Sequence, residues 1–135
     1  MSGLVGQSLG RYHIIERLGE GGMATVYKAY DTRLERDAAV KIIRRDVFPP
    51  NQLENILKRF EREAKSLAKL SNPHIVNILD FGEHEGMPYL VMEYLPGGTL
   101  KKLIGKSVPW QEAVHLILPV ARGIAYAHQS GILHR

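Results

Sequence analysis

The sequence has no cysteine, no long apolar run and no block of one charge sign, and each absence excludes a class of protein. Without cysteine there is neither a disulfide framework nor a cysteine-ligated zinc site, which fits a reducing compartment. No apolar stretch approaches the roughly 20 residues that a membrane-spanning helix needs. Residues 1–6 lack the basic and apolar regions of a signal peptide. We therefore expect a globular, cytoplasmic protein, although a membrane anchor could lie outside this sequence.

The net charge of +4 is spread along the chain rather than concentrated in one segment. Lysines and arginines are interspersed with acids, and the basic pairs Arg44-Arg45 and Lys101-Lys102 are short. A solvated surface explains this pattern better than a nucleic-acid interface does, so we expect no nucleic-acid partner. The 135 residues suffice for one hydrophobic core, and the sequence contains no repeats or low-complexity segments.

The most informative stretch is a glycine-rich turn between two segments that have the apolar and aromatic content of strands. These segments are residues 12–18 and 26–30. Glycine has no Cβ, so the backbone between them is free to adopt positive φ and to approach a ligand closely. Exposed N–H groups in such a turn suit phosphate oxygens. The glycines concerned are Gly19, Gly21 and Gly22.

A third predicted strand, residues 38–43, carries a single cation, Lys41, within an apolar run. Taken alone, the glycine turn is as consistent with a flexible loop as with a phosphate-binding loop. Taken alone, Lys41 is consistent with a lysine on an edge strand. The turn, Val26 and Ala39-Val40-Lys41 in this order and spacing favour a phosphate-binding site instead.

Together these motifs resemble the start of a protein kinase domain of the bacterial serine/threonine type. Residues 19–27 are similar to the glycine-rich loop of that group, and residues 39–41 to the strand bearing its phosphate-binding lysine. Ala24 occupies the third glycine position of the motif. The resemblance implies that the loop covers the phosphates of ATP and that apolar residues cover the adenine. The residues it assigns to the nucleotide here are Leu18, Gly19, Glu20, Gly21, Gly22, Met23, Ala24, Thr25, Val26, Ala39 and Lys41.

A helix is predicted over residues 52–70 from an apolar stripe that includes Phe60. Glu63 is the one charged residue inside the stripe, and a carboxylate buried without a partner is costly. Lys41 is the matching cation on a strand. The alternative is a glutamate at the rim of the stripe that reaches water. The resemblance favours the first reading, because it makes this helix the kinase helix αC and Glu63 its ion-pairing, catalytic glutamate.

Residues 87–95 form the fifth predicted strand, which resembles the kinase strand leading into the hinge between the two lobes. The resemblance implies that Met92 is the gatekeeper at the back of the adenine pocket. It also implies that backbone groups of Glu93 and Leu95 bind adenine. From the pattern alone, only a buried strand followed by a loop is expected.

After the hinge we expect a short helix near residues 100–104 and a longer one from about Pro109 to Gly131. The sequence ends with His134-Arg135, which resembles the first two residues of the kinase His-Arg-Asp motif. The catalytic aspartate and the Mg²⁺ ligands of the family follow that point, so we predict no metal ligand in this chain.

These observations predict an α+β fold with three parts: a flexible lead-in over residues 1–10, a kinase small lobe over residues 11–95, and the hinge end with the start of a large lobe over residues 96–135. The small lobe is expected to hold a five-stranded antiparallel sheet and helix αC.

The resemblance implies that the whole protein transfers the ATP γ-phosphate to serine or threonine of a protein substrate, with Mg²⁺ as the metal. The 135 residues alone are expected to be inactive. The alternatives are a non-catalytic nucleotide-binding or interaction module and, less favoured, a nucleic-acid-binding domain. Apolar surface left uncovered on the last helix favours self-association.

Overall fold

The computed structural model describes residues 3–133, which divide into two compact units. The first unit runs through Lys69 and resumes over Asn77–Tyr94, and the second comprises Leu70–Val76 and the chain from Leu95 onward. The C-terminal His134-Arg135, which the sequence likens to a kinase motif, lies outside the described residues.

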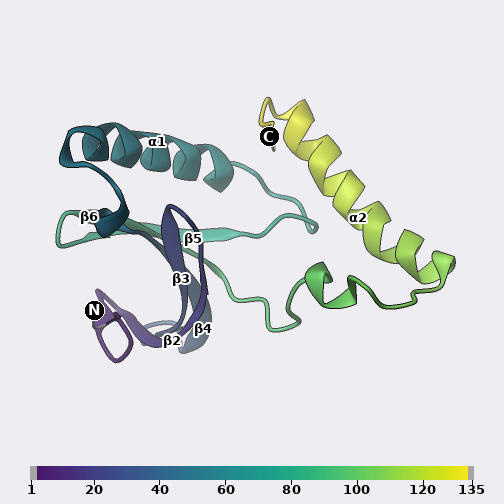
Figure 1. Ribbon diagram of the computed structural model, residues 1–135, viewed down its shortest axis with the longest axis horizontal. Coiled ribbons are helices and arrows are strands. Elements are labelled where there is room, and N and C mark those ends of the chain that lie inside the picture. Colours follow the sequence, from purple (N-terminus) through teal and green to yellow (C-terminus); the bar gives the residue numbers. More distant parts are fainter. Residues whose placement is uncertain (1–2, 134–135) are drawn as a thin grey trace. The chain divides into compact units, whose positions relative to one another are not determined.

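A six-stranded antiparallel sheet forms most of the first unit (Figure 1). Its spatial order is β1-β2-β3-β4-β6-β5. The strands are β1 (Ser8–Leu9), β2 (Tyr12–Glu20), β3 (Ala24–Asp31), β4 (Arg36–Ile43), β5 (Ile78–His84) and β6 (Met87–Glu93). The predicted α+β class is confirmed, but the strand count is six rather than five.

The additional strand comes from the segment that was expected to be a flexible lead-in. Leu9 of β1 is fully buried, and Ser8 and Leu9 pair with the start of β2. The backbone of Gly6 and Gln7 is also hydrogen-bonded to Ile14. A single buried leucine followed by Gly10 carries no alternating pattern, so this two-residue strand could not be predicted from the sequence.

Local sequence explains the tight connections within the sheet. Glu85 and Gly86, with φ values of 50° and 76°, form the two-residue turn between β5 and β6. Positive φ at both positions is the backbone of a turn that matches the twist of the two strands. At the centre of the sheet, β4 is buried over most of its length, because β3 and β6 flank it on either side.

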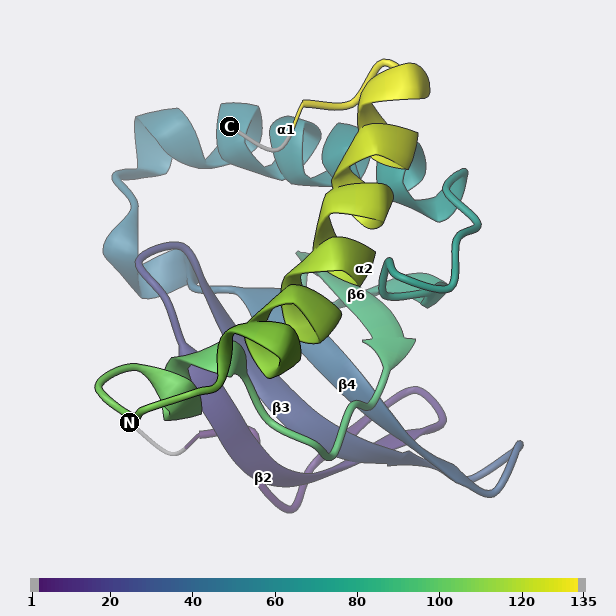
Figure 2. The ribbon, with the colours of Figure 1, turned by 90° about the vertical axis from the view of Figure 1, so that its right-hand side faces the viewer.

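The sheet is curled, so that strands far apart in its order meet. The Tyr12 hydroxyl on β2 donates a 2.7 Å hydrogen bond to Asp80 on β5, although three strands separate the two in the sheet. The rings of Tyr12 and Tyr89 pack edge to face with centroids 6.4 Å apart. Figure 2 shows the twist of β2, β3 and β4 that accompanies this closure.

Helix α1 (Pro50–Ala68) packs against β5 and β6 (Figure 1). Pro50 occupies the first turn, where its missing N–H costs nothing. Most of the predicted apolar stripe faces the sheet, although Leu67 and Ala68 near its end are exposed. Ala64 is buried, the Phe60 ring lies 6.3 Å from the Phe81 ring, and other stripe residues pack on the core: Leu53, Ile56 and Leu57.

The second unit contains a short 3-10 helix over Leu100–Leu103 and the longer helix α2 (Trp110–Gln129). Gly123 of α2 lies against the backbone of His74, where an added Cβ would be 2.9 Å from the carbonyl oxygen. Gly131, with φ of 78°, follows the helix end as predicted. Much of the apolar face of α2 is exposed, including Trp110, Val114 and Ile117.

Candidate functional site

Strand register brings the predicted nucleotide residues of β2, β3 and β4 onto one face of the sheet. Gly19 pairs with Val26, and Val26 pairs with Lys41. Directly paired residues on antiparallel neighbours point to the same side. Ala39 lies two residues before Lys41 on that side and pairs with Met92 of β6. Four strands therefore present Gly19, Val26, Ala39, Lys41 and Met92 together.

The glycine turn between β2 and β3 is open. The Gly21 N–H donates to Ala24 O at 2.9 Å, which closes the turn. A Cβ built on Gly19 or Gly22 would meet nothing within 4 Å, and one on Gly21 would make only an ordinary contact with Ala24 O. None of the three glycines adopts positive φ, so that expectation is wrong. The fold itself therefore does not require glycine here, and what glycine provides is free space above the backbone.

The remaining residues of the turn differ in exposure. Ala24 and Thr25 are buried at the start of β3, whereas the Met23 side chain is exposed. Leu18 lies in a register shift between Arg17 and Gly19 and is 43% exposed. Such bulges redirect a side chain relative to its strand.

Lys41 is partly buried on β4, between Val26 of β3 and Leu90 of β6. Within residues 3–133, no carboxylate lies within 4 Å of its ammonium group. Its positive charge is thus available to an anionic group.

Glu63 does not contact Lys41 in this structure. Its side chain is 60% exposed, and its carboxylate accepts a 3.0 Å hydrogen bond from Arg59 Nε one turn earlier in α1. The expectation that Glu63 is buried in the apolar stripe is wrong. It neighbours Ala64 at the rim of the stripe, where water and an arginine satisfy the carboxylate at little cost. The pairing of Glu63 with Lys41 stays a prediction.

The hinge residues are divided between the two units. Met92 and Glu93 belong to the end of β6, and Leu95, which is exposed, begins the second unit. The Glu93 N–H already donates to Asn77 O, and its carboxylate accepts from the Asn77 N–H. A contact of the Glu93 backbone with adenine would therefore have to use its carbonyl oxygen.

Sequence reasoning missed an ion-pair network around Glu20. Arg17 donates to one Glu20 carboxylate oxygen at 2.8 Å, and Arg44 donates to the other at 2.5 Å. Arg44 also donates to Asp46 at 3.1 Å. The bond to Asp46 is the main cause that raises the pKa of Arg44, and the same bond lowers the pKa of Asp46. The only sequence signal was the pair Arg44-Arg45. We call this network and the glycine turn the open end of the strands.

A second network lies at the opposite end of the same strands, and we call it the closed end. The Asp31 side chain, 2% exposed, accepts N–H bonds from Arg33 and Leu34 and pairs with Arg11 at 3.2 Å. Tyr12 joins it through Asp80, which also lies 3.9 Å from Arg11. Burial first, and the hydrogen bond to Asp80 second, raise the pKa of Tyr12 to about 12.

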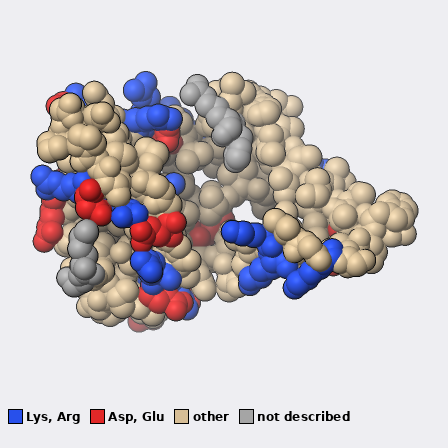
Figure 3. Space-filling view, viewed as in Figure 1, with Lys and Arg blue, Asp and Glu red and all other residues tan. Residues whose placement is uncertain are grey.

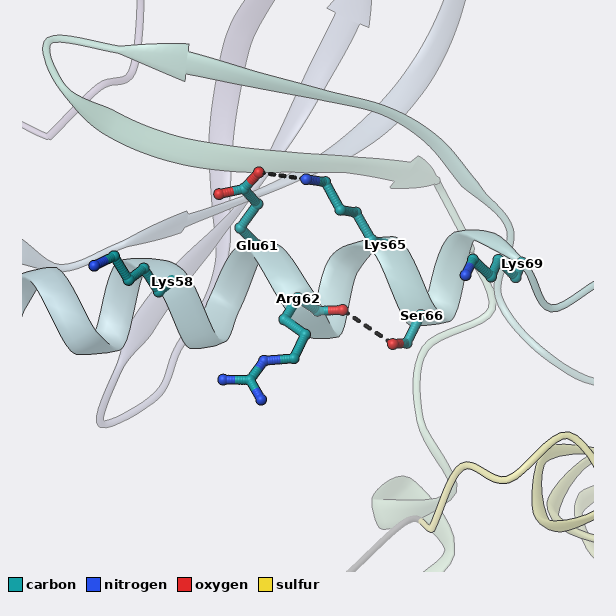
Figure 4. Close-up of a pocket in the computed structure, with 6 residues that line it drawn as sticks. All are labelled: Lys58, Glu61, Arg62, Lys65, Ser66 and Lys69. Carbon is teal, nitrogen blue, oxygen red and sulfur yellow. Dashed lines mark hydrogen bonds and ion pairs between the residues drawn. The ribbon is translucent and has the colours of Figure 1, made fainter.

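Two hollows in the first unit lie away from the glycine turn. One runs along α1 and is lined by side chains of that helix and of Lys69, the residue after it. Lys65 is paired with Glu61, and Ser66 donates to the Arg62 carbonyl (Figure 4). The other lies where α1 meets β5 and β6, and its walls are mainly apolar. On the face drawn in Figure 3, acidic and basic groups alternate over the first unit, as the ion pairs require.

Within residues 3–133, no three histidine, aspartate or glutamate side chains gather closely enough to hold a metal ion. Over the same residues, neither helix combines the length and the hydropathy needed to cross a bilayer.

The family model of the protein kinase domain matches residues 12–135. The chain belongs to the protein kinase family. Its curated relatives include a probable serine/threonine-protein kinase of Clostridium perfringens, 44% identical over 98% of this chain and 19% of that protein. They also include the serine/threonine-protein kinase PrkC of Bacillus subtilis, 43% identical over 98% of this chain and 20% of that protein.

Solved structures share the fold. The apo form of PpkA-294 matches with a TM-score of 0.85 at 30% identity, over 99% of this chain and 54% of that one. A mutant kinase domain of PknI from Mycobacterium tuberculosis matches with a TM-score of 0.76 at 28% identity, over 100% of this chain and 55% of that one. This protein kinase chain is thus the N-terminal part of the domain. It spans about half of the solved chains and about a fifth of the curated relatives.

Proposed function

We propose that this chain supplies the ATP-binding part of a serine/threonine protein kinase, and that the whole protein transfers the ATP γ-phosphate to serine or threonine in protein substrates. The observation that carries the proposal is the row of Gly19, Val26 and Lys41 on one sheet face, beside a glycine turn with open space above it. Membership of the protein kinase family supports the same reading.

The residues present suit a nucleoside triphosphate. Lys41 has no acidic partner within the described residues 3–133, so its ammonium is free to bind phosphate oxygens. The backbone N–H groups of residues 19–24 would cover the phosphates, and Leu18, Val26 and Ala39 the adenine. Met92 would lie behind the adenine, with Glu93 and Leu95 at its edge. Bound Mg²⁺ would neutralise charge on the phosphates, and the family places its ligands after Arg135.

Catalysis of this type depends on positioning and charge stabilisation. Glu63 is proposed to orient Lys41 when the kinase is active, which requires it to exchange Arg59 for Lys41. A polypeptide limited to these 135 residues is expected to transfer no phosphate, since the group that orients the acceptor hydroxyl follows Arg135 in the family.

Lys41→Met in the full-length protein tests the proposal. Phosphate transfer from ATP to a generic basic protein should fall by about two orders of magnitude or more, because a charge contact to the phosphates is lost. Lys58→Met, on the exposed face of α1, is the matched control and should retain activity. Near wild-type transfer by Lys41→Met would remove Lys41 from the mechanism. ATP binding without any transfer by the wild-type protein would favour the non-catalytic module.

A further inference from the structure

Arg44 contacts both arms of the glycine turn. Its guanidinium donates to the Glu20 carboxylate, at the end of β2. Its backbone N–H donates to Met23 O at 2.9 Å, at the other side of the turn. Arg44 itself directly follows β4, the strand that carries Lys41. One residue thus links both sides of the turn to the strand of the proposed phosphate-binding lysine.

The β2–β3 pairing holds Gly19 and Glu20, but residues 21–23 have few other contacts. The Gly21 N–H donates to Ala24 O, and a Cβ added to Gly19 or Gly22 would meet nothing within 4 Å. Glycine segments lose much conformational entropy when they are held in place, so a turn of this kind needs external contacts to be ordered. The Arg44 side chain is only 27% exposed, whereas the Arg17 side chain, the other partner of Glu20, is 60% exposed. Arg44 is therefore the better-fixed of the two partners.

The charge of Glu20 gives Arg44 a second effect. A carboxylate between Gly19 and Gly21 lies beside the segment proposed to cover phosphates and would repel a polyanion. Arg17 and Arg44 balance the charges of Glu20 and Asp46, so the open end is neutral as a group. The guanidinium of Arg44 contacts two carboxylates with two different nitrogens, which an ammonium group does not reproduce.

We propose that Arg44 is a positioning residue for nucleotide binding. Through Glu20 and Met23 it fixes the glycine turn, and it neutralises the Glu20 carboxylate, which lies beside the segment proposed to cover the phosphates. This inference rests on the proposed ATP site, and it assigns Arg44 a role in ATP affinity rather than in the transfer step.

The experiment compares Arg44→Ala, Glu20→Gln and the double variant of the full-length protein, with Arg33→Ala as control. Arg33 is an exposed arginine on the turn after β3, at the other end of the strands. Hydrogen exchange is measured without nucleotide at the amide of Gly21, which donates to Ala24 O, and at the amide of residue 44, which donates to Met23 O. ATP KM and kcat are measured on the same proteins.

Both single variants should speed exchange at these amides several-fold, and the double variant should add little to Arg44→Ala, because the two residues act through one contact. Arg44→Ala should raise the ATP KM by about 5-fold with kcat within about 2-fold, as expected for a loss of binding that is equal in ground and transition states. Glu20→Gln should raise KM less, since it also removes the repelling charge. Arg44→Lys should recover part of the loss, and Arg33→Ala should match wild type.

Unchanged exchange in Arg44→Ala, or equal changes in Arg33→Ala, would overturn the proposal. Faster exchange with an unchanged KM would also overturn it, because Arg44 would then stabilise the turn without affecting nucleotide. If the wild type bound no ATP, the proposed function would fail, and the exchange rates would still decide whether Arg44 holds the turn.

Discussion

The two ends of strands β2, β3 and β4 carry ion networks of similar composition in opposite surroundings. At the closed end, Asp31 is buried and its carboxylate has three partners. At the open end, the Glu20 carboxylate has two arginine partners, but its side chain is 37% exposed. Burial makes the first network expensive to break, since a charge left unpaired away from water is costly. Water replaces lost partners cheaply in the second.

This difference separates two tasks along one set of strands. The closed end joins β2 to β5 and holds the curled sheet together. The open end leaves space above the glycines and is held by contacts that a ligand is able to rearrange. Regions that adjust to ligands belong to the less stable parts of a fold. The predictions below test this contrast, from the largest expected effect on stability to the smallest.

Gly82→Ala should destabilise the first unit most. Gly82 of β5 pairs with Tyr89, and an added Cβ would lie 2.4 Å from the Tyr89 ring and hydroxyl. Tyr89 is itself packed edge-on against Tyr12, so it has little room to move. We expect a loss of roughly 1–3 kcal/mol in the free energy of unfolding. Urea denaturation measures it, and wild-type stability would show that the closed end tolerates repacking.

Tyr12→Phe should cost less, because it removes one hydrogen bond without changing the packing. The lost bond joins Tyr12 to the Asp80 carboxylate across the curled sheet. We expect about 1–2 kcal/mol in the free energy of unfolding, in the range for hydrogen bonds to charged groups. Tyr30→Phe, on the exposed side of β3, is the control. Equal effects of the two variants would mean that the bond to Asp80 does not hold the sheet.

Acid should weaken the closed end through Asp31. Burial raises the pKa of Asp31, but the N–H groups of Leu34 and Arg33 and the charge of Arg11 outweigh it, so the net pKa lies below its usual 3.8. A carboxyl with a lowered folded-state pKa stabilises the fold above its unfolded pKa. That stability is lost as the pH falls from about 4 through the folded pKa.

Asp31→Asn, which still accepts N–H bonds, should flatten this part of the pH dependence. Thermal unfolding between pH 2 and 6 measures the effect. If Asp31→Asn loses stability in acid just as the wild type does, the loss would be assigned to other carboxylates, such as Asp46, whose pKa is lowered chiefly by its hydrogen bond to Arg44.

Gly21→Ala should have the smallest effect on stability. Gly21 does not adopt positive φ, and its added Cβ would meet only Ala24 O at 3.7 Å. The free energy of unfolding should change by less than about 0.5 kcal/mol. ATP affinity should nevertheless fall, because the methyl group fills space that the phosphates are proposed to approach. A clear loss of stability in urea would show that the turn is more constrained than the open end described above.

The sequence alone determined most of the elements and the family. The glycine turn followed by Val26 and Lys41, and the apolar stripe around Phe60, are local patterns with fixed spacing. Periods of two and 3.6 residues assign strands and helices from such patterns. The same spacing, together with antiparallel pairing, accounts for Gly19, Val26 and Lys41 lying on one face.

Only the tertiary structure decided which side chains meet. Periodicity placed Glu63 in the stripe, but a residue at its rim turns toward either the sheet or water, and here it pairs with Arg59. Tyr12 and Asp80, which are 68 positions apart in the sequence, meet because the sheet curls, and no local pattern encodes this contact. The Glu20–Arg44 contact likewise joins residues 24 apart. The side of a helix or strand on which a residue lies follows from the backbone repeat of that one element. The side chain that it contacts depends on how several elements pack together.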